Sequence, residues 1–158
     1  ACTGKTPDRK QNKVYSLKLS GIDGELNAHN KALFANYQKI QDNETMSETF
    51  MCDDADVVLT AYGTAARVCK KAIKLLRDQG IKAGLFRPIT LWPFPQKELE
   101  AACKNAKKIL TVEMSMGQMV QDVKLYSGHK VSDVEFYGEP GGIIPSVDTI
   151  IEKVKQYV

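Results

Sequence analysis

The chain has 158 residues, of which 43% are hydrophobic and 26% are charged, and its formal net charge is +3. This length supplies one hydrophobic core and is short for two full-sized domains. The basic residues are spread along the chain, which argues against the concentrated positive surface that duplex nucleic acid requires. No apolar run reaches the roughly 20 residues of a membrane helix, and the polar N-terminal stretch is unlike a signal peptide. We expect a cytoplasmic protein with no nucleic-acid or membrane partner.

The first third of the chain is polar and carries turn formers early. One helical pattern runs from about Glu25 to Gln41 and places a few apolar side chains on a common face. We expect residues 1–53 to form a linker and helical arm that belongs to a larger subunit, and residues 54–158 to form the folded domain.

From Asp56 onward, short apolar runs alternate with amphipathic stretches. Strands are expected at residues 57–60, 82–86, 108–113 and 134–137. Helices are expected after residue 63, after Pro95, over residues 116–126 and from Val147 onward, and Gly80 is placed to end the first of them. This alternation predicts a three-layer α/β fold, in which a mostly parallel sheet carries helices on both faces.

The turn after the first predicted strand contains the best candidate for a binding site. Gly63 permits a tight turn, and Thr64 is placed to cap the next helix. Arg67 is expected in the first turn of that helix, where free backbone amides favour negative charge. We therefore consider Gly63, Thr64 and Arg67 a candidate anion site for a cofactor phosphate or a partner carboxylate. The alternative is a solvated arginine, as we infer for the lysines further along the same helix.

Other patterns predict no metal site and no catalytic residue. The cysteines are widely spaced and have no companion histidine at metal-ligand spacing, so we expect no metal ligands among them. Cys69 and Cys103 fall on apolar helix faces and are expected in the core. Neither His29 nor His129 has a nucleophile at a recognisable spacing.

Three stretches of the chain closely resemble a known family: DADVVLTAYGTAARVCKKAIKLLRDQGIKAGLFRPITLWPFP, VEMSMGQMVQDV and EFYGEPGGIIPS. They are similar to the C-terminal, transketolase-like domain of the alpha subunit of 2-oxoacid:ferredoxin oxidoreductases, most nearly of the 2-oxoisovalerate type. The combination of RPITLWPFP with EMSMGQM is the specific part of the match. A strand followed by AYG and a helix is shared more widely, so part of a transketolase or of a 2-oxoacid dehydrogenase beta subunit is an alternative.

The resemblance implies an enzyme that oxidatively decarboxylates a 2-oxoacid to an acyl-CoA and reduces ferredoxin. It also implies thiamine diphosphate, Mg²⁺, iron-sulfur clusters and coenzyme A in the complete enzyme, with none of them bound by this fragment alone. The fragment would be an inactive assembly domain, with Trp92, Phe94 and Met116 as interface residues. Its partners would be the N-terminal domain of the same subunit, the beta and gamma and ferredoxin-like subunits, and ferredoxin. The role of Glu113, which resembles a recurring glutamate of such domains, is left open, and a free-standing anion- or small-molecule-binding α/β module is the alternative function.

Overall fold

A computed structural model of the chain describes residues 24–158. The strands are β1 (Ser47–Phe50), β2 (Val57–Thr60), β3 (Ala83–Pro88), β4 (Lys108–Glu113) and β5 (Val134–Gly138). The helices are α1 (Glu25–Asn43), α2 (Gly63–Asp78), α3 (Gln96–Cys103), α4 (Met119–Tyr126) and α5 (Val147–Lys155), with a short 3-10 helix η1 (Val131–Asp133) before β5. A compact unit runs from Ile40 to Val158, and the earlier residues fall outside it.

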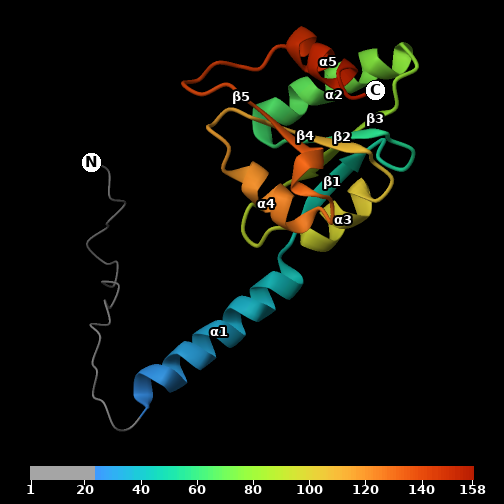
Figure 1. Cartoon of the computed structure of the whole chain (residues 1–158). Helices are drawn as coiled ribbons and strands as arrows, with labels where there is room; N and C mark the ends of the chain where they lie inside the picture. The colour runs from blue at the N-terminus through green and yellow to red at the C-terminus, as the bar shows by residue number, and fades with distance from the viewer. Residues whose placement is uncertain (1–23) are drawn as a thin grey trace. The chain divides into compact units, whose positions relative to one another are not determined.

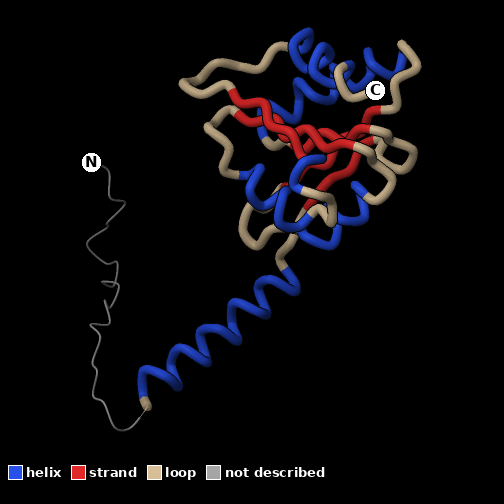
Figure 2. Tube along the Cα trace, viewed as in Figure 1, coloured by secondary structure: helices blue, strands red, loops and turns tan. Residues whose placement is uncertain are grey.

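The strands form one sheet (Figure 2). Their order in it is β1-β3-β2-β4-β5. β2 pairs in parallel with both β3 and β4, and β4 pairs in parallel with β5. The edge strand β1 pairs antiparallel with β3. The sequence prediction of a mostly parallel sheet is therefore confirmed.

The sheet is covered by α2 and α5 on one face and by α3 and α4 on the other (Figure 1). Successive side chains of a strand point to opposite faces, so Val57 and Leu59 enter the first core layer and Val58 enters the second. All four residues of β2 are buried. The predicted three-layer α/β architecture is confirmed.

The cysteines of the described chain are structural. Cys69 and Cys103 are fully buried, on α2 and α3 respectively, as the sequence predicts. Burial raises the pKa of each thiol to about 12, because the thiolate is poorly solvated there. Cys52 is also buried, and its thiol donates to the carbonyl of Leu85 at 3.1 Å. Cys2 lies outside the described residues.

Strand β1 was missed by the sequence patterns, which assigned residues 1–53 to an arm. Its sequence, Ser-Glu-Thr-Phe, is short and mostly polar, and only Phe50 packs against the core. Glu48 of β1 lies opposite Arg87 of β3, so the sheet begins before residue 54. The boundary between arm and domain at residues 53 and 54 stays a prediction.

After β1 the chain must cross β3 to reach the central strand β2. The crossing is close, because a Cβ placed on Gly84 would lie 2.6 Å from the carbonyl oxygen of Met51. Arg77 at the end of α2 fixes the same segment, donating to the carbonyls of Ala83 and Met51 at 2.8 Å each and to the Asp54 carboxylate at 2.7 Å. Gly84 is therefore required where two backbone segments touch.

We expect Gly84→Ala to lower the free energy of unfolding by about 2 kcal/mol, because the added methyl group overlaps backbone that cannot move without shifting β1. Urea unfolding followed by circular dichroism measures the change. Thr49→Ala, at an exposed position of β1, is the control and should change the stability by less than about 0.5 kcal/mol. Equal stability of Gly84→Ala and wild type would contradict the close crossing.

Candidate functional site

Strands β2, β3, β4 and β5 are parallel, so their carboxyl ends meet at one edge of the sheet. The start of α2 lies at this edge, together with residues 89–95, 114–118 and 139–146, which follow β3, β4 and β5. Ligands and contacts of open α/β sheets are commonly found at such an edge. The candidate site residues from the sequence all belong to these segments.

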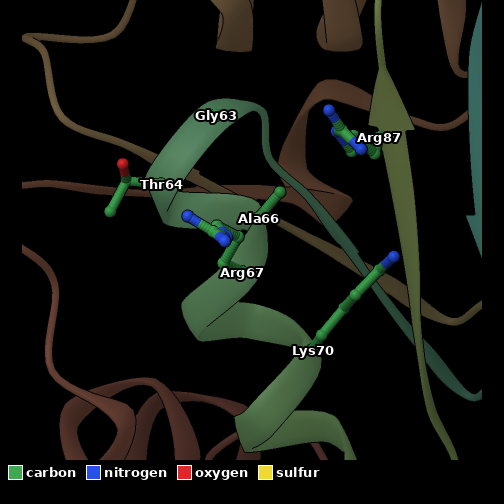
Figure 3. Close-up of a pocket in the computed structure, with 6 residues that line it drawn as sticks. All are labelled: Gly63, Thr64, Ala66, Arg67, Lys70 and Arg87. Atoms are coloured by element: carbon green, nitrogen blue, oxygen red, sulfur yellow. The ribbon is translucent and has the colours of Figure 1, made fainter.

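A cleft of about 360 Å³ opens beside the start of α2 (Figure 3). It is lined by residues of α2 and by one residue of β3: Gly63, Thr64, Ala66, Arg67, Lys70 and Arg87. Arg67 and Lys70 lie one turn apart on the same helix, and Arg87 faces them from the end of β3 (Figure 3). The three predicted residues of the anion site are thus brought together, and two further cations join them.

The local geometry differs from the sequence expectation in two details. Tyr62 is the N-cap of α2, and no side chain caps this end. Thr64 does not cap the helix as predicted, because it lies inside the first turn, beyond the position from which a hydroxyl reaches the free amides. Arg67 is the fifth residue of α2 and therefore lies in its second turn. The expectation for Gly63 is consistent with its positive φ of 56°.

One carboxylate is ion-paired with two of the three cations of the cleft. Glu48 of β1 accepts a hydrogen bond from Arg87 at 2.9 Å and another from the ammonium of Lys70. Hydrogen bonds from Lys70 and then Arg87 lower the pKa of Glu48 below its ordinary value. The same ammonium group lies 5.8 Å from the centre of the Phe50 ring. Glu48 therefore fastens β1 to both β3 and α2.

The sequence patterns missed Glu48, Lys70 and Arg87 as members of this cluster. Lys70 was interpreted as part of the solvated face of α2, yet it is only partly exposed and paired with Glu48. Its position three residues after Arg67 was a usable signal, because residues at that spacing share a helix face. Arg87 and Glu48 gave no local signal, since they are brought together by the register of β1 on β3.

Glu113, whose role the sequence left open, is buried at the end of β4. Its carboxylate accepts hydrogen bonds from the Val120 amide at 2.9 Å, the Met119 amide at 3.1 Å and the Ser115 hydroxyl at 2.8 Å. The carboxylate thereby satisfies two backbone amides at the start of α4 and one hydroxyl of the loop that precedes it. Both carboxylate oxygens accept from the chain's own donors, so Glu113 ties the loop after β4 to the start of α4.

The proposed interface residues lie in different environments. Trp92 is 58% exposed and Met116 is 74% exposed, in the loops after β3 and β4 respectively. Phe94 is only 7% exposed and its ring stacks on Tyr126, with a centroid distance of 5.9 Å. Phe94 therefore belongs to the core between α3 and α4, and it offers little surface for the expected interface.

No cluster of three or more potential metal-ligating side chains occurs within residues 24–158. Over the same residues, no helix is both long and apolar enough to cross a membrane.

Solved structures that resemble this fold include an oxidoreductase and a transketolase. A 2-oxoglutarate:ferredoxin oxidoreductase from Magnetococcus marinus, solved with 2-oxoglutarate, coenzyme A and succinyl-CoA, superposes with a TM-score of 0.75 at 22% identity, over 87% of this chain and 24% of that one. A split-gene transketolase, an inactive β4 tetramer, superposes with a TM-score of 0.55 at 16% identity, over 71% of this chain and 41% of that one. The chain is thus an α/β domain of the transketolase C-terminal type.

Sequence comparison narrows this class to one family. The profile of the pyruvate:ferredoxin oxidoreductase core domain II matches residues 55–150, and the chain belongs to this family. The ketoisovalerate oxidoreductase subunit VorB of Methanothermobacter marburgensis is 39% identical over 132 residues, which are 84% of this chain and 37% of that protein. The 2-oxoglutarate synthase subunit KorA of the same organism is 38% identical over 103 residues, 65% of this chain and 27% of that protein. The chain therefore spans well under half of these relatives.

We expect Glu113→Gln to lower the free energy of unfolding by about 2 kcal/mol, because an amide nitrogen would replace one of two acceptor oxygens among buried donors. Urea unfolding measures the loss, and the amides of Met119 and Val120 should exchange faster with deuterium. Glu152→Gln makes the same chemical change at an exposed position of α5 and should have little effect. Unchanged exchange at the two amides would show that the carboxylate does not hold them.

The ion pairs of Glu48 with Lys70 and Arg87 predict that the stability of the fold depends on pH. Because the pKa of Glu48 is lowered in the folded chain, its ion pairs stabilise the fold above the ordinary value of 4.5 and this stabilisation is lost as the pH falls through the lowered pKa. The melting temperature of wild type should therefore exceed that of Glu48→Gln at neutral pH, and the difference should vanish in acid. Thermal melts at several pH values measure it, with Glu152→Gln as the control. A difference independent of pH would contradict the ion pairs.

Proposed function

We propose that this chain is an assembly domain of a thiamine diphosphate-dependent 2-oxoacid:ferredoxin oxidoreductase. The complete enzyme oxidatively decarboxylates a 2-oxoacid, transfers the acyl group to coenzyme A and reduces ferredoxin. The observation that carries the proposal is the family match over residues 55–150, supported by relatives that are named as subunits of such enzymes. In this proposal the fragment alone has no activity.

The edge at which the parallel strands end supports an assembly role. Large apolar side chains are exposed there after three successive strands: Ile89, Leu91 and Trp92 after β3, Met116 after β4, and Ile143 and Ile144 after β5. Water contact with such groups is unfavourable, and exposed apolar groups gathered in this way are typical of protein interfaces. Trp92 is the proposed centre of the contact, because tryptophan is enriched among the residues that dominate binding energy.

The cofactors and partners follow from the same proposal. Thiamine diphosphate, Mg²⁺, the iron-sulfur clusters and coenzyme A are bound by other parts of the complete enzyme, and they supply the carbanion, electron-transfer and acyl-carrier chemistry. The partners are the N-terminal domain of the same subunit, the beta, gamma and ferredoxin-like subunits, and ferredoxin. The part of residues 1–53 that precedes β1 serves in this proposal as the linker and arm towards the rest of the subunit.

The proposed substrate is a branched-chain 2-oxoacid, 2-oxoisovalerate. This choice is supported by the similarity to two ketoisovalerate oxidoreductase subunits, which extends over 84% of this chain. The similarity to 2-oxoglutarate synthase subunits covers less of the chain, at most 66%. Pyruvate synthase is represented at 32% identity over 69 residues.

Viologen reduction tests the proposed activity and substrate. The dye is followed with 2-oxoisovalerate, 2-oxoglutarate or pyruvate in the presence of coenzyme A, for this chain alone and for the complete subunit purified with its partner subunits. We expect reduction by the complex alone, fastest with 2-oxoisovalerate. Turnover by the isolated chain would contradict the proposed assembly role. Preference of the complex for another 2-oxoacid would contradict 2-oxoisovalerate as the proposed substrate.

We expect Trp92→Ala in the complete subunit to weaken assembly with the partner subunits by at least about tenfold, because a large apolar contact is lost at the interface. Co-purification and the dissociation constant by light scattering measure it. Leu125→Ala is the matched control: Leu125 is 69% exposed, but it lies at the end of α4, away from the carboxyl ends of the strands. If both variants assemble like wild type, Trp92 is not at the interface.

A further inference from the structure

The cleft beside α2 has an unbalanced charge. Three cationic side chains line it, Arg67 and Lys70 from α2 and Arg87 from β3. Within residues 24–158, Glu48 is the one carboxylate that forms ion pairs with them, so two positive charges are left uncompensated. Figure 3 shows the three cationic groups around the same hollow.

Arg67 is the least compensated of the three. No ion pair or hydrogen bond of its guanidinium is found in the described part of the chain, whereas Lys70 and Arg87 share Glu48. Arg67 and Lys70 are three residues apart on one helix, an arrangement in which like charges repel. The nearby helix end adds positive potential, and it has no side-chain cap. An anionic ligand would reverse each of these unfavourable interactions.

We propose that this cleft binds a phosphoryl dianion, as a phosphomonoester or the diphosphate group of a small ligand, between Arg67 and Arg87. A phosphate group near pH 7 carries between one and two negative charges, which match the uncompensated cations, and guanidinium groups bind it in a forked geometry. The volume of about 360 Å³ accommodates the group with a small adjoining moiety. This site lies at the same edge of the sheet as the proposed assembly surface, but it is lined by other residues and does not depend on that function.

Glu48 acts as a competitor in this site. Its carboxylate already engages Lys70 and Arg87, so a bound phosphoryl group shares these two cations with it and repels it. Removal of the Glu48 charge should therefore strengthen binding, although it removes two ion pairs from the fold. If Glu48, Lys70 and Arg87 had a purely structural role, removal of the Glu48 charge would not strengthen phosphate binding.

Isothermal titration of the full 158-residue chain with inorganic pyrophosphate tests the proposal, and amide chemical shifts of Gly63 and Thr64 locate the binding. We expect Arg67→Gln and Arg87→Gln each to weaken binding by about tenfold, because each removes charge-assisted hydrogen bonds. Glu48→Gln should tighten it by about threefold or more. Lys74→Gln removes one charge from the same helix outside the cleft and should change the affinity less than about twofold.

Three results would overturn the proposal. One is the absence of pyrophosphate binding at millimolar concentration, where even weak specific sites are occupied. Another is equal weakening by Lys74→Gln and Arg67→Gln, which would indicate diffuse charge attraction. The third is tighter binding of an acidic peptide than of pyrophosphate, which would assign the cleft to a protein carboxylate. Titration with ADP beside pyrophosphate distinguishes a nucleotide ligand from a free diphosphate, because a nucleotide site should bind ADP more tightly than pyrophosphate. Thermal melts confirm that each variant is folded.

Discussion

The structure depends on the need to cover both faces of a parallel sheet. β2 has no exposed residue, and it is flanked by β3 and β4 on its two sides. Its apolar side chains alternate between two core layers, so α2 and α5 must cover one face while α3 and α4 cover the other. The four parallel strands, β2 to β5, then end at the same edge, and the loops that lead into the helices gather there. Both the basic cleft and the exposed apolar loops are consequences of this arrangement.

The parts of the fold that the sequence predicts are those with a local physical signal. A strand buried on both faces needs an uninterrupted apolar run, and such runs predicted β2 and β4 with the bounds that the structure has. β1 carries no such run, because an edge strand of four residues buries little and is held by ion pairs. The packing of Phe94 gave no local signal for a related reason: its ring stacks on Tyr126 from α4, a residue distant from it in the chain.

The candidate site shows the same division between local and distant signals. Gly63, Thr64 and Arg67 follow one strand directly, so the sequence placed them together. Arg87 enters the cleft from β3, and its hydrogen-bond partner Glu48 lies 39 residues before it in the chain. Only the antiparallel register of β1 on β3 brings these two side chains together. A single sequence contains no pattern for such a pair, because its spacing is set by the crossing at Gly84 and not by a helix or strand period.

Ion pairs contribute more to the attachment of β1 than to the attachment of the central strand β2. β2 is held by backbone pairing on both sides and by two apolar layers, neither of which salt weakens. β1 pairs on one side only, and its segment is held by Lys70 and Arg87 through Glu48 and by Arg77 through Asp54. These pairs are partly exposed and are screened by ions in solution. An anion bound in the cleft would compete with Glu48 for Lys70 and Arg87. Anion binding and the ion pairs that attach β1 to the sheet therefore oppose each other.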